Sequence, residues 1–214
     1  MPQASPSGET ASIEVRDADA SDLSTLIEIT SKAYRGDPLI GYFVRNDSGQ
    51  CEGLRRLFDF CLREQALAHG QVTMTRDGSA CAAWLPPAKA RPAMSLVEQV
   101  ALLPRMARIC SLARVPRLLA TMRLLERHHP GGPPHHYLYL LAVLPERQGQ
   151  GLGSALLQAG LRAIDRARGA TYLETASERN VALYRRHGFV VTGEARLPSD
   201  GPRVWFLWRE PQAV

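Results

Sequence analysis

The spacing of apolar residues predicts a domain in which strands and helices are mixed. Runs that alternate, or that are rich in β-branched and aromatic residues, indicate strands, and apolar residues at every third or fourth position indicate helices. The predicted strands cover residues 13–16, 72–76, 79–85, 136–143, 190–196 and 203–209. A first predicted helix follows a cap at Asp19 or Ser21. Further helices are predicted over residues 52–69, 152–164 and 179–187. Gly36-Asp37-Pro38 ends the first helix, and a loop is expected over residues 39–46.

Two segments depart from this alternation. Residues 1–11 are polar, small and Pro-bearing, which is typical of a disordered tail. Residues 95–129 are rich in Leu, Arg and Met and are broken by Pro104 and Pro116, so we expect a helical insertion of two or three short helices. We interpret this insertion both as a cover for one side of the sheet and as one wall of a binding pocket.

A glycine-rich run lies between a predicted buried strand and a predicted amphipathic helix. It reads Gln148-Gly149-Gln150-Gly151-Leu152-Gly153-Ser154. Glycines let the backbone approach a ligand closely, and the positive end of the helix dipole favours a phosphate there. The run is therefore predicted to cradle a pyrophosphate. Glycines that only cap the helix are the alternative, but three glycines in this run are more than a cap needs.

A dinucleotide-binding fold is the first competing interpretation of this run. Gly149-x-Gly151 is half of its fingerprint, and Glu174 follows at about the distance of a ribose-binding acid. However, Ser154 occupies the third glycine position, and the run begins about two-thirds of the way along the chain. Too little sequence remains for a doubly wound nucleotide domain, which we exclude.

A different family fits both the run and the segment after it. Gln148-x-x-Gly151-x-Gly153 resembles the pyrophosphate loop of the GCN5-related N-acetyltransferases (GNAT). Residues 171–176 resemble the family's fifth strand, and Asn180, Tyr184 and Gly188-Phe189 resemble its second cofactor motif at the usual spacing. The likeness covers residues 137–208 strongly and the N-terminal part weakly.

Within the family the likeness is greatest to the puromycin N-acetyltransferase type. Ala83-Trp84-x-x-Pro87 and Gly201-Pro202-Arg203-x-Trp205 also match that type. Gln150 departs from it, because a basic residue is usual at this position. The first half of the chain, which would recognise the acceptor, diverges further from the puromycin type.

The elements together predict a single α/β (α+β) domain over residues 12–210. Its sheet is expected to be mixed and mostly antiparallel, with about seven strands and helices on both faces. The resemblance implies that the sheet splays open between its fourth and fifth strands, and that this gap holds acetyl-CoA. It implies cofactor contacts at Leu141, Ala142, Val143, Gln148, Gly149, Gln150, Gly151, Leu152, Gly153, Ser154, Asn180 and Tyr184.

The implied reaction is direct transfer of an acetyl group to a primary amine of a small molecule, with an antibiotic such as puromycin as one acceptor. An amine with a lysine-like pKa is neutral in only about one molecule in a few thousand at pH 7, so a base is needed. Glu174 is the leading carboxylate and Asp37 the second, while a structural role for Glu174, or a water chain as base, stays open.

The departing thiol and the thioester oxygen need donors as well. Tyr184 occupies the family's general-acid position, and a core tyrosine is the alternative. A backbone N–H near Ala142 or Val143 is implied as the donor to the thioester oxygen.

Composition excludes several other classes. Four cysteines without paired spacing are expected to be small buried residues in a reducing compartment, with no disulfide framework. No metal is expected, and the histidine-rich residues 128–136 are interpreted as a polar turn because no carboxylate or cysteine accompanies them. The net charge of +5 is spread along the chain, so no nucleic-acid partner is expected.

No apolar run is long enough for a membrane span, and residues 1–10 lack the features of a signal peptide. We therefore expect a cytoplasmic enzyme without a membrane partner, as a monomer or homodimer. Two other functions stay open: transfer of the acetyl group to a protein or peptide, and a CoA-binding sensor without catalytic activity.

Overall fold

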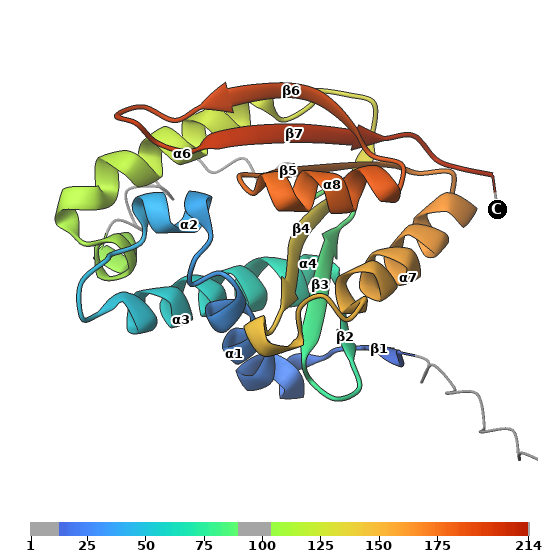
Figure 1. Ribbon diagram of the computed structural model, residues 1–214, viewed down its shortest axis with the longest axis horizontal. Helices are drawn as coiled ribbons and strands as arrows, with labels where there is room; N and C mark the ends of the chain where they lie inside the picture. Colours follow the sequence, from blue (N-terminus) through green and yellow to red (C-terminus); the bar gives the residue numbers. More distant parts are fainter. Residues whose placement is uncertain (1–12, 90–103, 214) are drawn as a thin grey trace, which may run out of the picture.

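The computed structural model describes residues 13–89 and 104–213 (Figure 1). The predicted tail at residues 1–11 and residues 95–103 of the predicted insertion lie outside the described residues. The strands are β1 (Val15–Asp17), β2 (Gln71–Thr75), β3 (Ala80–Leu85), β4 (His135–Val143), β5 (Ala170–Thr175), β6 (Val190–Arg196) and β7 (Arg203–Arg209). The main helices are α1 (Leu23–Ala33), α2 (Pro38–Phe43), α3 (Gln50–Phe60), α4 (Leu67–His69), α6 (Val115–His128), α7 (Leu152–Arg166) and α8 (Glu178–Arg186).

Within the described residues, the seven strands form one sheet in the order β1-β2-β3-β4-β5-β7-β6. β4 and β5 are parallel, and the other neighbouring pairs are antiparallel. The predicted mixed, mostly antiparallel sheet is therefore confirmed. The parallel pair is joined through α7, which is the crossover helix that follows the glycine-rich run.

The sheet opens between β4 and β5, as predicted. Their pairing ends at Tyr137 opposite Tyr172, while β4 continues to Val143. The register between β3 and β4 shifts around Tyr139, which is an extra residue on β4. In Figure 1, β5, β7 and β6 run across the direction of β3 and β4. The last part of β4 therefore presents an edge that no strand covers.

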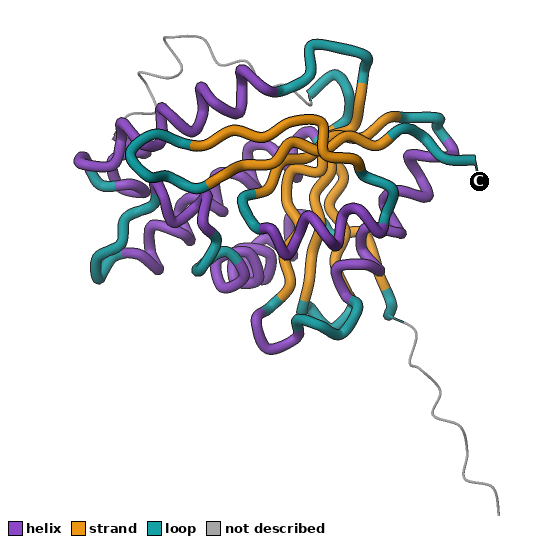
Figure 2. The backbone as a smooth tube through the Cα atoms, turned by 45° about the horizontal axis from the view of Figure 1, so that its top comes forward, coloured by secondary structure: helices purple, strands orange, loops and turns teal. Residues whose placement is uncertain are grey.

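Helices cover both faces of the sheet, as Figure 2 shows by the purple segments on either side of the orange strands. On one face, α1, α3 and α6 bury a core that includes Leu26, Phe58 and Tyr172. On the other face, α7 and α8 pack on Trp84 and Leu173. Burial of this apolar surface is the main stabilising contribution to the fold.

The expected loop over residues 39–46 was wrong. Residues 38–43 form helix α2, because the Asp37 side chain caps it and Pro38 occupies its first turn. Asp37 Oδ1 accepts hydrogen bonds from the backbone N–H groups of Leu39 and Ile40, both at 2.9 Å. The same signals that end α1 therefore begin the next helix.

The part of the insertion that is described is helical and packs on one side of the sheet. Residues 104–110 are helical, and α6 follows them. α6 packs against α2, and the His128 ring at its end stacks on Phe206 of β7 with 4.5 Å between ring centroids. None of the described helices is long and apolar enough to cross a membrane.

The histidine-rich segment at residues 128–136, which was expected to be a polar turn, is partly buried. His135 is buried, and its Nε2 lies 3.0 Å from His129 Nε2, beside the Tyr172 and Trp208 rings. Among the residues that the structure describes, no group of three or more His, Cys, Asp or Glu side chains is arranged to hold a metal. The cysteines are free; Cys81 and Cys110 are buried, but the prediction that all are buried fails at the exposed Cys51.

Candidate functional site

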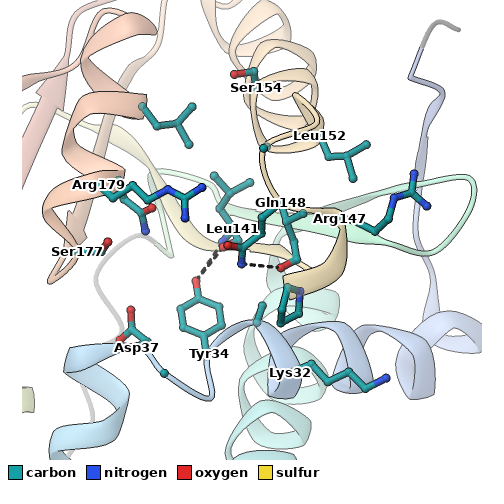
Figure 3. Close-up of a pocket in the computed structure, with 18 of the residues that line it drawn as sticks. Lys32, Tyr34, Asp37, Leu141, Arg147, Gln148, Leu152, Ser154, Ser177 and Arg179 are labelled. Atoms are coloured by element: carbon teal, nitrogen blue, oxygen red, sulfur yellow. Dashed lines mark hydrogen bonds between the residues drawn. The ribbon is translucent and has the colours of Figure 1, made fainter.

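A cavity of about 1060 Å³ opens where the sheet splays (Figure 3). Its floor is the end of β4 and the glycine-rich run. One wall is the segment that joins α1 to α2, at residues 32–38, and the other is α8 with Ser177 before it. The cavity therefore lies where the resemblance places the cofactor.

The glycine-rich run lines the cavity and leads directly into α7. Gly149 and Gly151 have φ angles of 79° and 83°, a region that other residues rarely adopt. Gly151 is the N-cap of α7, and no side chain caps this helix among the described residues. The first N–H groups of α7 are therefore left for a ligand, and the helix dipole adds a positive potential there.

The open edge of β4 supplies the second set of backbone groups. Leu144 N–H donates to Ser79 O at 2.9 Å, so the backbone groups of Leu141 and Val143 point away from β3, into the cavity. Val143 O accepts a hydrogen bond from Gln148 Nε2 at 3.3 Å. An extended ligand with amide groups can pair with this edge as a strand would.

The Tyr34 side chain holds this edge in the structure. Its hydroxyl donates to Leu141 O at 3.2 Å and accepts from Leu141 N–H at 3.3 Å, as the dashed lines in Figure 3 show. Its ring packs on Phe58 with 5.1 Å between centroids. One hydroxyl thus satisfies both groups of Leu141 that a bound ligand would use.

The lining of the cavity is strongly basic. Its cationic residues are Lys32, Arg35, Arg147, Arg179 and Arg186. Lys32 pairs with Glu28, and Arg147 pairs with Asp77. Among the described residues the other three cations form no salt bridge, so they are available to a polyanionic ligand.

Two residues of the second motif meet the cradle. Asn180 and Tyr184 both lie on α8 and line the cavity. Tyr184 is buried, and its ring packs on Phe189 at 5.9 Å between centroids. Burial, with a smaller contribution from the charges of Asp37 and Glu174, raises the pKa of the Tyr184 hydroxyl well above its usual value. The hydroxyl is therefore protonated at neutral pH.

Glu174 lies on β5, behind the cavity. The Tyr137 hydroxyl donates a hydrogen bond to Glu174 Oε1. Burial raises the pKa of Glu174 to about 7, and the nearby Tyr137 and Tyr172 hydroxyls limit the rise. Its side chain shares the face of Tyr172, and it is not among the residues that line the cavity.

Most of the predicted cofactor residues come together in this cavity. Those that line it are Leu141, Val143, Gln148, Gly149, Gly151, Leu152, Gly153, Ser154, Asn180 and Tyr184. Ala142 does not, because it pairs with Cys81 of β3 and its side chain is buried in the core on the opposite face. Gln150 does not either, and its side chain accepts a hydrogen bond from Arg147 Nε at 3.0 Å.

Apart from Asp37, the sequence alone missed the wall formed by residues 32–38, and it missed the cations on α8. Arg179 and Arg186 are seven positions apart, which places them on one side of the helix with Asn180 near them. This spacing could have identified the two arginines from the sequence. Nothing local marks Lys32 or Tyr34, whose roles depend on where α1 packs against β4.

Comparison with known proteins gives the class. A family model described as the acetyltransferase (GNAT) domain matches residues 113–191. Two mycothiol acetyltransferases are similar: one from Acidimicrobium ferrooxidans is 40% identical over 79 residues, and one from Arthrobacter sp. is 42% identical over 64 residues. These matches cover 36% and 28% of this chain, and the chain spans only 23% and 20% of the relatives' lengths.

Solved structures extend the likeness to the whole domain. A Corynebacterium glutamicum structure, titled as histone acetyltransferase HPA2 and related acetyltransferase, has a TM-score of 0.71 and 28% identity, covering 95% of this chain and 98% of that one. Arylalkylamine N-acetyltransferase 2 from Aedes aegypti shares the fold, with a TM-score of 0.62 at 11% identity over 94% of this chain and 99% of that one. Residues 113–191 therefore match a GNAT acetyltransferase domain, and the chain as a whole has the GNAT fold. These relatives do not support the predicted puromycin type.

Proposed function

We propose that this chain is an acetyl-CoA-dependent N-acetyltransferase that acts on a primary amine of a small molecule. One observation carries the proposal: the splayed end of β4, the uncapped glycine cradle and the Tyr184 hydroxyl line the same cavity. A cradle alone fits many phosphate ligands. A cradle joined to an open strand edge and a protonated phenol fits a long thioester ligand that reacts at its far end.

The residues present fit acetyl-CoA. The backbone of residues 149–154 and the start of α7 would hold the pyrophosphate, with Arg179 and Arg186 close to the negative charges. Leu141 and Val143 would pair with the amide groups of the pantetheine arm, and Asn180 is a further polar contact. The Cβ of a side chain at position 149 would have no heavy atom within 4 Å, so this part of the cradle is open.

When bound, acetyl-CoA supplies an acetyl thioester that the amine attacks directly. The N–H groups of Leu141 and Val143 face the edge where the thioester oxygen gains negative charge, and they are the proposed donors. Tyr184 is the proposed donor to the departing sulfur. Because its pKa is raised above that of a thiol, it donates a hydrogen bond and shares its proton with the sulfur.

Glu174 is the proposed base, acting through water or through its tyrosine neighbours. Its pKa of about 7 suits removal of a proton near neutral pH. A purely structural carboxylate, held by Tyr137, is the competing role for the same geometry. The pH dependence of a Glu174→Gln variant separates the two.

Acceptor class is tested directly, because the relatives carry different names, mycothiol acetyltransferase in one case and histone acetyltransferase in another. The experiment measures thiol release from acetyl-CoA with a panel of small amines, including puromycin and aminoglycosides, and with peptides that carry lysine or a free N-terminus. Mass spectrometry identifies the acetylated product.

We expect turnover with at least one small amine. Turnover confined to peptides would overturn the small-molecule acceptor and favour protein acetylation. Binding of acetyl-CoA without turnover of any acceptor would indicate that the protein is a CoA-binding sensor and not an enzyme. Because acetyl-CoA is an intracellular metabolite, we further propose that the enzyme acts in the cytoplasm, and sizing in solution will distinguish a monomer from a homodimer.

A further inference from the structure

Asp37 is the one carboxylate among the described residues that line the cavity, where five cationic side chains also lie. It comes from the wall between α1 and α2, next to Tyr34, and Figure 3 shows both side chains on the same side of the cavity, across from Ser177 and Arg179. Among the described lining residues, Asp37 is therefore the one that can attract a cationic ligand by its charge.

The carboxylate of Asp37 is held rigidly by one of its two oxygens. Oδ1 accepts the N–H groups of Leu39 and Ile40, both at 2.9 Å, which fixes the side chain as the cap of α2. Among the described residues, Oδ2 has no hydrogen-bond partner. The side chain is half-buried, so an ion pair at Oδ2 would be less screened than one on the surface.

Asp37 also lies near the reacting end of the cavity. Its charge is one of the causes that raise the pKa of the Tyr184 hydroxyl, and it acts in the same direction on Tyr34. Tyr34 in turn bonds to Leu141, at the strand edge proposed for the thioester. The free oxygen of Asp37 therefore belongs to the volume in which the acceptor must meet the acetyl group.

We infer that Asp37 binds the ammonium group of the acceptor through Oδ2, so that the enzyme selects amines that arrive protonated. This inference rests on the proposed N-acetyltransferase function and adds the charge of its acceptor. Glu174 does not compete for this role, because it does not line the cavity and its Oε1 is engaged by Tyr137. Asp37 acts here by binding and orienting the amine, and the proton is removed separately.

The test uses Asp37→Asn, which keeps the size of the side chain and caps a helix as well as Asp does. Loss of a hydrogen bond between charged groups should raise the KM of the panel amine with the highest turnover by about 10-fold to 100-fold. The KM of acetyl-CoA should stay within about twofold of the wild-type value. The melting temperature should stay within a degree or two of the wild type. Glu52→Gln, which removes an exposed carboxylate outside the cavity, is the matched control.

A second readout separates binding of the ammonium from a structural effect. Hydrolysis of acetyl-CoA without amine uses water, a neutral nucleophile, and should change far less than amine transfer in Asp37→Asn. Similarly, the alcohol analogue of the same amine, used as an inhibitor, should bind the wild type and the variant equally. Asp37→Ser, which also caps a helix, replaces Asp37→Asn if that protein does not fold.

The outcomes distinguish this inference from the proposed function. If amines turn over and the amine KM is unchanged in both variants, Asp37 is only the cap of α2 and the inference is wrong. If hydrolysis falls in parallel with amine transfer, Asp37 does not act on the ammonium. If no amine turns over with wild-type protein, the proposed function fails, and this inference fails with it.

Discussion

Two sides of the cavity, the glycine-rich run with α8 (here the first wall) and residues 32–38 (the second wall), show two ways of building a binding site. The glycine-rich run and α8 supply mostly backbone groups and a few side chains at fixed spacing, within residues 148–186. The wall at residues 32–38 contributes the side chains of Tyr34 and Asp37, and Tyr34 reaches Leu141 across more than a hundred residues of sequence. The first wall suits a ligand that never varies, such as a cofactor, and the second is free to change with the acceptor.

The strongest test of this contrast is Tyr184→Phe, on the first wall. The variant loses one hydroxyl and keeps the ring that packs on Phe189. General-acid help is worth about 10²–10⁴-fold, so kcat should fall by that order when thiol departure limits the rate. Calorimetry should show unchanged acetyl-CoA affinity, and the melting temperature should barely move.

Two other results would revise the role of Tyr184. A fall in acetyl-CoA affinity alone would make it a cofactor contact. An unchanged kcat together with unchanged affinity would make it a core tyrosine.

Gly153→Leu should close the cavity without breaking the helix. A Cβ at this position would lie 3.7 Å from Val143 Cγ2 and 3.8 Å from Leu183 Cδ2, so a larger side chain would extend between β4 and α8. The φ of Gly153 is not positive, and leucine is the better helix former by roughly 0.5–1 kcal/mol. Calorimetric affinity for acetyl-CoA should fall about 100-fold or more, with no loss of melting temperature.

The companion variant Gly153→Ala should weaken binding much less, because its Cβ alone makes ordinary contacts. Gln158→Leu, on the exposed side of the same helix, controls for added apolar surface. Wild-type affinity in a folded Gly153→Leu protein would disprove the cradle.

Glu174 lies on neither wall, and the pH dependence of the protein's stability tests how it is buried. Its pKa of about 7 in the folded protein lies above the ordinary 4.5, so the folded state keeps a proton that the unfolded chain loses between these values. Stability is therefore lost as pH rises through this window, by roughly 3 kcal/mol. Denaturant titrations should show this slope in the wild type and its absence in Glu174→Gln.

The same variant tests the base. If Glu174 is the base, kcat/KM for the amine should rise with pH through about 7 in the wild type, and Glu174→Gln should lose that limb. A pH–rate profile identical to that of the wild type would leave Glu174 with a structural role.

The smallest expected effect is on the second wall. Tyr34→Phe removes both hydrogen bonds to Leu141 and leaves the ring on Phe58. Acetyl-CoA would then no longer have to displace the hydroxyl from the strand edge. Because a hydrogen bond is worth about 0.5–1.5 kcal/mol net, the affinity should rise about twofold to tenfold in calorimetry. A tenfold fall would show instead that the hydroxyl touches the cofactor.

The elements with a clear local signal were predictable. The final hairpin, residues 190–196 and 203–209, was placed correctly because two runs with β-branched or aromatic residues flank a Pro-Ser-Asp-Gly turn. Helix α2 was not, because its six residues are too short to show a period and its cap coincides with the end of α1. Short elements of this kind are determined by caps and tertiary contacts.

The sequence by itself indicated the GNAT fold, a glycine-rich phosphate loop and the positions of Asn180 and Tyr184, because backbone binding of a pyrophosphate requires glycines at fixed intervals and a helix directly after them. Only the tertiary structure decided which side chains face those groups. Packing of α1 on β4 brings Tyr34 to Leu141, and the cap of α2 turns Asp37 toward the same space. Contacts of this kind join segments far apart in the chain, where no local spacing records them.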